Sequence, residues 1–295
     1  MGRVYVLSVV GLLSACSSDS GSVAACATDI EVGEVQPFAE PTPTGTEGIV
    51  FDIEGTLYVS AQDPTGPDQL LQIANNGTNR SLVEWPSILG LARDSRGILG
   101  ASIDRGEVLL IVRGVGVVEV LASGVGAPNF IVTTPWDTML VSDSTPGRDI
   151  IYDVTFEGDV SEWVRGVPTP NGIVFSLDRT TLYVATTSEQ PGLWRVPASP
   201  SGEPGTPERW VEFPEGSAPN GVAIDSEGNV YVALNLAGEV AKVDPEGNAT
   251  TLATDVTGIA SFAFGEGSRD PCSLYATNLL GTQMFRVGTG VLGPR

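Results

Sequence analysis

The sequence predicts an all-β chain that folds as a six-bladed β-propeller with four-stranded blades. A pair of short apolar strands around an Asp/Gly turn returns along the chain at intervals of about 40 residues, the length of such a blade. No stretch after residue 16 shows a sustained helical period. The 36 Gly and 21 Pro residues suit many short strands joined by tight turns.

Each copy of the repeat is expected to supply the innermost half of one blade. Inner strands of a propeller are covered on both faces, so they should appear as nearly continuous apolar runs. Two weaker, alternating strands follow, such as residues 238–243 and 249–253. The copies are Gly48–Val59, Gly90–Leu99, Asn129–Val141, Asn171–Val184, Asn220–Val232 and a degenerate sixth made of Ile259–Phe264 and Ser273–Thr277.

The two ends of such a ring must join, because an unpaired sheet edge would otherwise remain. Asp29–Phe38 has the pattern of an outer strand with no blade before it, and the sixth copy lacks a fourth strand after Gly288. We therefore expect Asp29–Phe38 to complete blade six. This closure brings Cys26 towards Cys272, and an exported pair is expected to form a disulfide. The alternative is two buried, unreacted thiols.

The first residues are predicted to be a targeting segment. Arg3 is followed by the apolar run Val4–Leu13, which is too short to span a bilayer. The run ends in Leu13-Ser14-Ala15-Cys16, which resembles the lipobox of bacterial lipoproteins. That resemblance implies cleavage before Cys16 and acylation of Cys16. The alternative is an ordinary signal peptide that is cut near Ala15 or Ala25.

The chain is therefore divided into a lipoprotein signal peptide at 1–15, a flexible tether at 16–28, the propeller at 29–290 and a tail at 291–295. The Ser, Gly and Ala content of the tether matches a flexible linker. We expect an exported monomer in the bacterial cell envelope, which contacts the membrane only through its lipid anchor.

Composition excludes several classes of function. The chain carries 36 acidic and 15 basic residues, a formal charge of −21, so phosphate backbones would repel it and nucleic-acid binding is not expected. It contains no histidine, which excludes Ser-His-Asp hydrolysis, Cys-His proteolysis and His-ligated zinc. The groups that remain available for catalysis or binding are carboxylates, amides, hydroxyls and a metal that prefers oxygen ligands.

One phase of the repeat collects polar side chains. The innermost strands of a propeller begin beside its axis, so equivalent positions in different blades should face one another. These positions are Glu47, Leu89, Asn129, Asn171 and Asn220. One carboxylate and three amides would form a site for a hard cation, and such a site suits Ca²⁺ better than Mg²⁺. The alternative is structural, because Asn is also a common turn residue.

These residues also carry a family resemblance. Thr46-Glu47-Gly48, Pro128-Asn129, Pro170-Asn171-Gly172 and Pro219-Asn220-Gly221 resemble the metal-site motifs of the SMP-30/gluconolactonase/LRE-like family, and the similarity covers most of residues 47–287. In that family a Glu, two Asn and an Asp bind Ca²⁺ or another divalent ion, which polarises a lactone or phosphoester for hydrolysis. Glu47, Asn129 and Asn171 match three of these ligands by position.

The fifth blade departs from the family pattern. The family usually has Asp where this chain has Asn220, so the ligand charge falls and the amide cannot act as a base or nucleophile. Ala127 stands where sugar lactonases often carry Arg, and Phe130 follows Asn129. A less polar lactone or ester is therefore expected as the substrate.

Two functions follow from this pattern. The first is a metal-dependent hydrolase of a small lactone or ester, in which Glu47, Asn129, Asn171 and Asn220 hold the cation and Glu47 and Asn220 belong to the catalytic centre. The second is a non-catalytic, lipid-tethered binding module. The fold does not decide between them, because propellers serve both uses.

Overall fold

The structure is a computed structural model that describes residues 26, 28–40 and 44–294. These residues form 24 strands and no helix. The described residues include no helix that is long and apolar enough to cross a membrane. The expected lipidation site Cys16 and the signal peptide lie outside the described residues.

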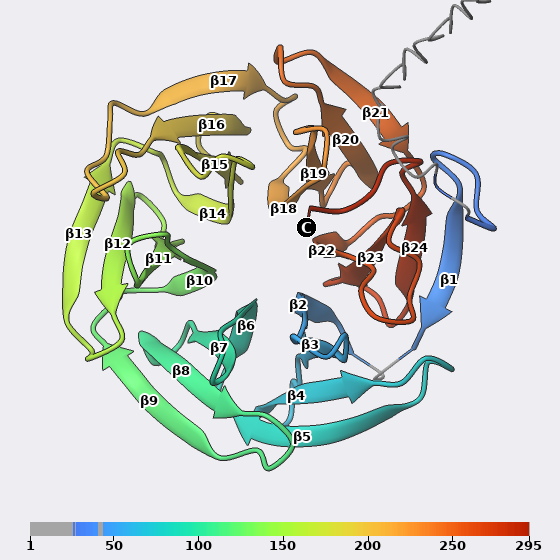
Figure 1. The fold of residues 1–295 in the computed structure, drawn as a ribbon, viewed down its shortest axis with the longest axis horizontal. Coiled ribbons are helices and arrows are strands. Elements are labelled where there is room, and N and C mark those ends of the chain that lie inside the picture. Colours follow the sequence, from blue (N-terminus) through green and yellow to red (C-terminus); the bar gives the residue numbers. More distant parts are fainter. Residues whose placement is uncertain (1–25, 27, 41–43, 295) are drawn as a thin grey trace, which may run out of the picture.

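The strands form six four-stranded antiparallel sheets, the blades of the propeller predicted from the sequence (Figure 1). Blade one contains β2 (Thr46–Phe51), β3 (Leu57–Ala61), β4 (Asp68–Ile73) and β5 (Asn79–Trp85). Blade two contains β6 (Ile88–Arg93), β7 (Gly97–Ser102), β8 (Glu107–Val112) and β9 (Val118–Ser123). Blade three contains β10 (Pro128–Thr133), β11 (Thr138–Asp143), β12 (Ile150–Thr155) and β13 (Val160–Arg165).

The remaining blades follow in chain order. Blade four contains β14 (Pro170–Phe175), β15 (Thr181–Thr186), β16 (Gly192–Pro197) and β17 (Glu208–Glu212). Blade five contains β18 (Pro219–Ile224), β19 (Val230–Leu234), β20 (Glu239–Val243) and β21 (Ala249–Ala253). Blade six contains β22 (Ile259–Phe264), β23 (Ser273–Asn278), β24 (Met284–Gly288) and the amino-terminal strand β1 (Val35–Ala39).

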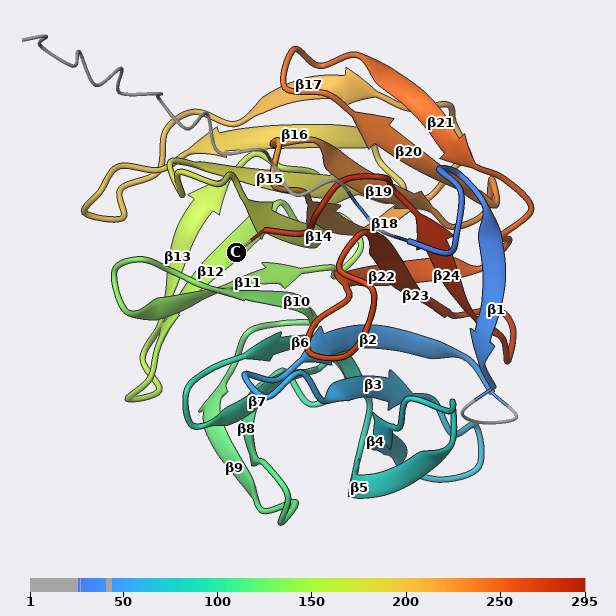
Figure 2. The same cartoon turned by 45° about the vertical axis from the view of Figure 1, so that its right-hand side comes forward.

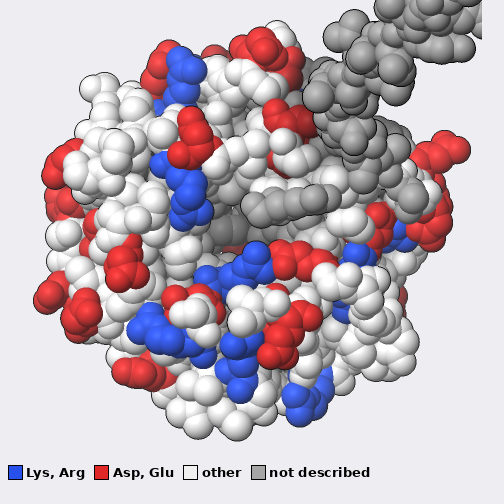
Figure 3. Space-filling model, in the orientation of Figure 1, with Lys and Arg blue, Asp and Glu red and all other residues white. Residues whose placement is uncertain are grey.

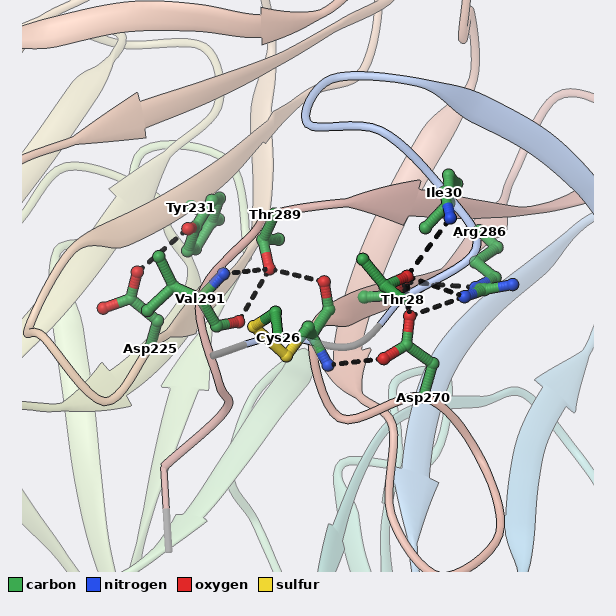
Figure 4. Close-up of a disulfide and its surroundings, with 11 residues drawn as sticks. Cys26, Thr28, Ile30, Asp225, Tyr231, Asp270, Arg286, Thr289 and Val291 are labelled. Atoms are coloured by element: carbon green, nitrogen blue, oxygen red, sulfur yellow. Dashed lines mark hydrogen bonds and ion pairs between the residues drawn. A yellow bond between two sulfur atoms is a disulfide. The ribbon is translucent and has the colours of Figure 1, made fainter. Parts of the chain in front are cut away.

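Strand β1 closes the ring as the sequence predicted. It pairs antiparallel with β24, with Val35 opposite Val287. Cys26 and Cys272, the pair expected from the sequence, form a disulfide with Cα atoms 5.8 Å apart (Figure 4). The first described residues are therefore joined to blade six both by a ladder of hydrogen bonds and by a covalent bond.

A partly buried ion pair supports this closure beside the disulfide (Figure 4). Asp270 accepts hydrogen bonds from Ser273 and Thr28 at 2.6 Å each and forms an ion pair with Arg286. Burial opposes the charged form of Asp270, but the hydrogen bonds outweigh it and lower the pKa to about 2. The Asp270 carboxylate thus links the amino-terminal segment to blade six.

Apolar clusters between neighbouring blades form the core. The cluster between blades three and four contains Trp163 and Trp194, and Trp136 packs against it. Trp136 stacks on Trp163 with ring centroids 6.3 Å apart, and in the next interface Trp210 stacks on Tyr183 at 5.3 Å. The tryptophans therefore pack blades together, which is how propellers bury the faces of their twisted sheets.

Candidate metal and substrate site

The second residue of each innermost strand occupies an equivalent place around the ring, and we call these six places the ring positions. Strands β2, β6, β10, β14, β18 and β22 contact one another in this order and then return to β2 (Figure 1). In chain order the ring positions hold Glu47, Leu89, Asn129, Asn171, Asn220 and Ala260. The three amides are consecutive, and Glu47 lies three blades away from Asn171, on the opposite side of the ring.

A backbone irregularity marks every ring position. In all six blades the pairing of the innermost strand shifts between its first and fourth residues, as between Thr46 and Ile49 in blade one and between Pro170 and Ile173 in blade four. Such bulges leave residues outside the ladder and re-aim their side chains, and they are frequent next to functional sites. The ring position lies within this bulge in each blade.

Glycines after the ring positions bring adjacent blades close together. A Cβ on Gly48 would lie 2.1 Å from the carbonyl oxygen of Leu89, and one on Gly172 would lie 2.3 Å from that of Asn220. Both distances are shorter than any real contact, so these positions require glycine. The Asn-Gly pairs that looked like turn signals therefore lie at the start of strands, where they allow one blade to approach the next.

Hydroxyl groups from the second strands stabilise this arrangement. Ser60 accepts a hydrogen bond from the Gly48 N–H at 2.7 Å and donates to the carbonyl of Leu89 in the next blade at 2.8 Å. Thr277 likewise accepts from the Ser261 N–H and donates to the carbonyl of Glu47. These bonds satisfy the main chain that the bulges release from the ladder.

The side-chain oxygens of the three amides have no such partner. Asn129, Asn171 and Asn220 are between 5% and 7% exposed, and the Oδ1 atom of each has no hydrogen bond within the described part of the chain. Asn171 Nδ2 donates to Thr187 Oγ1 at 2.8 Å, which fixes the amide and leaves its oxygen free. Unpaired buried oxygens are rare, and a group of three indicates a ligand that would satisfy them.

Glu47 is the carboxylate of the ring. Its side chain is 4% exposed and forms no hydrogen bond or ion pair with the described residues. Burial, and to a smaller extent the negative charge of Asp68, raises the pKa of Glu47 to about 7. A bound cation would reverse this effect, because it favours the charged form.

The donor set fits a hard cation. Carboxylate and amide oxygens are the ligands that Ca²⁺ prefers, with water completing the coordination shell. Among the residues that the structure describes, no three His, Cys, Asp or Glu side chains form a group that could hold a metal. A cation at the ring would therefore depend on the amides together with Glu47. Leu89 and Ala260 supply no ligand and separate Glu47 from the amides on both sides.

Two other buried carboxylates have structural roles. Asp143 accepts hydrogen bonds from the N–H groups of Ala127 and Thr145 at 3.0 Å each. Asp225 accepts from the N–H of Asn229 and from the hydroxyl of Tyr231, both at 2.9 Å. Both carboxylates cap turns at strand ends. Asp143 Oδ2 also has no hydrogen bond, but it lies 3.6 Å from Arg148 Nη1, whereas no cation or hydrogen bond lowers the pKa of Glu47.

A groove leads to Glu47 from the side of the ring where the innermost strands begin. It lies between blades one and two and has a volume of about 940 Å³. Its lining includes Glu47, Leu89, Asp68 and Asp104. Sequence reasoning missed the two aspartates because they lie outside the phase of the ring positions, Asp68 at the start of β4 and Asp104 in the turn between β7 and β8.

Comparison with known proteins identifies the family of the chain. The family model of the SMP-30/Gluconolactonase/LRE-like region matches residues 122–278, more than half of the chain. The chain belongs to this family. The match spans blades three to five and strands β22 and β23 of blade six, and it includes the three ring amides.

Two curated proteins are similar to this chain in sequence. Pentonolactonase XacC from Haloferax volcanii is 29% identical over 223 residues, which are 72% of this chain and 75% of XacC. A 6-deoxy-6-sulfogluconolactonase from Pseudomonas putida is 37% identical over 83 residues, 28% of each chain.

Two solved structures are below 25% identity and share the fold. Regucalcin from Agrobacterium tumefaciens, described as a calcium-binding protein, has a TM-score of 0.72 and 22% identity over 88% of this chain and 95% of its own. The gluconolactonase XC5397 from Xanthomonas campestris has a TM-score of 0.72 and 17% identity, with 92% and 97% coverage.

Proposed function

We propose that the protein is a metal-dependent hydrolase of a lactone or ester, with a divalent cation, Ca²⁺ first of all, held by Glu47, Asn129, Asn171 and Asn220. The observation that carries this proposal is the set of three buried amide oxygens without partners, in phase with the buried Glu47 side chain, whose pKa no hydrogen bond or cation lowers. A cation accounts for all four groups at once.

The ring residues have two roles in the proposed hydrolysis, binding the cation and accepting a proton. A bound cation would polarise the carbonyl of the substrate and stabilise the negative charge that develops on its oxygen. Water adds to the carbonyl carbon, the acyl C–O bond breaks, and the departing oxygen takes up a proton to give a hydroxy acid or an alcohol and an acid. Glu47 is the ring residue that can accept the proton of the water, since Asn220 has an amide and can only bind.

The relatives support a lactone as the substrate. The two curated proteins with significant sequence similarity are both named as lactonases, of a pentonolactone and of a sulfogluconolactone. Phe130, which is 6% exposed, packs in the core of blades three and four, so it does not face a bound substrate as the sequence suggested.

A panel of lactones and esters, measured with Ca²⁺ and with a chelator, tests the proposal. We expect Ca²⁺-dependent turnover that Glu47→Gln abolishes and that Asp159→Asn leaves unchanged, because Asp159 lies in an exposed turn of blade three. Turnover that survives chelation and Glu47→Gln would contradict a metal-dependent mechanism.

A non-catalytic binding module is the second candidate, and Asn220 favours it. An amide in place of the family's usual Asp keeps a cation ligand but removes a base. In that case Asn220→Asp would strengthen Ca²⁺ binding while turnover stayed at background. A rise of both together would favour the hydrolase.

We further propose that the protein is exported and anchored in the bacterial cell envelope through Cys16. The disulfide supports export, because such bonds persist in oxidising compartments. Cys16→Ser should move the protein from the membrane fraction to the soluble fraction, as measured by fractionation and acyl labelling. An unacylated, soluble wild-type protein would contradict the anchor.

A further inference from the structure

The groove that leads to Glu47 has a strongly acidic lining. Its walls come from the connection between β3 and β4, the starts of β2 and β6, and the turn between β7 and β8. Glu47, Asp63, Asp68 and Asp104 contribute carboxylates to this lining, and no Lys or Arg belongs to its described residues. Arg105 follows Asp104 in sequence but pairs with Glu107 at 3.5 Å.

Main-chain N–H groups orient two of these carboxylates, and Asp68 also accepts from Ile88. Asp68 Oδ1 accepts a hydrogen bond from the Asp63 N–H at 3.1 Å, and Asp63 Oδ1 accepts from the N–H and hydroxyl of Thr65. Asp104 is exposed in the turn between β7 and β8. Glu47, more than nine-tenths buried and without a partner, lies in the same lining.

We propose that this groove binds the substrate and selects a positively charged group on it, so that the preferred substrates are lactones or esters that bear a protonated amine or a quaternary ammonium. The inference rests on the proposed hydrolase, whose reacting carbonyl would lie beside Glu47. Asp68 and Asp104 are the specificity-determining residues, since their carboxylates lie along the approach to Glu47.

The charge balance supports a cationic substrate over an anionic one. Even with a divalent cation bound beside Glu47, four carboxylates leave a net charge of about −2 in the groove. Like charges brought together in a cleft oppose binding, and opposite charges favour it. A lactone with a sulfonate, such as the one named for the Pseudomonas putida relative, would therefore bind poorly here.

A matched pair of substrates tests the selection. α-Amino-γ-butyrolactone, kept below the pKa of its amine, carries a positive charge, and α-acetamido-γ-butyrolactone has the same ring without the charge. At low ionic strength we expect kcat/KM to favour the amine by roughly tenfold, mainly through KM, and the preference to shrink at high salt. A sulfonated or phosphorylated lactone should react more slowly than both.

Asp68→Asn and Asp104→Asn should each reduce the preference by roughly threefold, while the control Asp159→Asn should leave it unchanged. Calcium titration of each variant verifies that the ring still binds the cation. Equal turnover of the charged and uncharged lactones, or a preference that both variants retain, would overturn the inference while leaving the hydrolase in place. Absence of turnover on every substrate would overturn the hydrolase and this inference together.

Discussion

The two ends of the innermost strands differ in how their polar groups are satisfied. At the end where these strands begin, three amide oxygens are buried without partners, and no hydrogen bond or cation lowers the pKa of the buried Glu47 carboxyl. At the other end, a cavity of about 550 Å³ is lined mainly by apolar side chains, such as those of Phe51, Ile224 and Phe264. The segment after β24 runs to the middle of the ring at this end (Figures 1 and 2).

Polar groups beside the carboxyl-terminal segment at this second end are paired. The Leu292 carbonyl accepts a hydrogen bond from Ser226 N–H at 2.8 Å, and Asp225 nearby accepts from both Asn229 and Tyr231. Basic and acidic side chains are interspersed over the face that carries the carboxyl-terminal segment (Figure 3). Both ends are built from the same repeated strand. The cluster of unsatisfied amide oxygens in one phase of the repeat therefore distinguishes the candidate site from the opposite end.

The largest expected effect is on cation binding by Glu47→Gln. The change removes the carboxylate of the ring but keeps its shape, so Ca²⁺ affinity should fall by roughly 100-fold or more. The metal-free protein should unfold no more easily, because a buried acid without a partner is replaced by a neutral amide. Calorimetry and urea unfolding measure the two quantities. Unchanged Ca²⁺ binding would mean that the unpaired groups are not a metal site.

At the end where the innermost strands finish, a mutation is expected to reduce stability and leave Ca²⁺ binding unchanged. Asp225→Ala deprives Tyr231 and two N–H groups of their buried acceptor, which should cost about 3 kcal/mol of unfolding free energy. The folded variant should bind Ca²⁺ as the wild type does. A loss of Ca²⁺ affinity without a loss of stability would remove the distinction between the two ends.

The fold could be predicted because the same strand pattern recurs in every blade. Six similar apolar strands at a constant interval specify six similar blades, and an unpaired strand at each end of the chain specifies the closure by β1. The sixth copy departs most from the repeat, because β22 and β23 are joined by a longer loop. Its ring position, Ala260, therefore appeared only in the structure.

The site could be predicted in part. Glu47 and the three amides follow from the phase of the repeat, and the structure places all four at equivalent positions. The bulges and the hydroxyls of Ser60 and Thr277 could not be foreseen, since they depend on contacts between strands and between blades. The acidic groove is hidden for the same reason, because Asp68 and Asp104 meet only through the packing of two blades.

A smaller effect is expected for Asn220→Asp. The change adds a second carboxylate to the ring, so Ca²⁺ affinity should rise by about tenfold. The gain is limited because two carboxylates at one empty site repel each other and raise the pKa of one of them. Titration calorimetry of both proteins measures the gain, with Asp159→Asn as the control for an unrelated charge change. Unchanged or weaker binding would show that Asn220 is not a ligand.

The smallest expected effect is the change in stability and in Ca²⁺ affinity with pH that the titration of Glu47 causes. Its pKa is raised from 4.5 to about 7 by burial and by Asp68, so the folded protein holds this proton more tightly than the unfolded chain. The contribution of Glu47 to the stability of the metal-free protein is therefore highest below pH 4.5 and declines as pH rises to 7. The cation needs the ionised form, so Ca²⁺ affinity should change in the opposite direction.

We expect Ca²⁺ affinity to rise about fivefold between pH 6 and pH 7 and to level off above, with close to one proton released for each ion bound at pH 6. Titrations in buffers of different ionisation enthalpy measure this release. Asp68→Asn removes the smaller cause of the raised pKa, so it should move the midpoint to lower pH and leave most of the effect of burial. An affinity that does not depend on pH between 6 and 7 would show that Glu47 is already ionised without the metal, and its lack of a partner would then need another explanation.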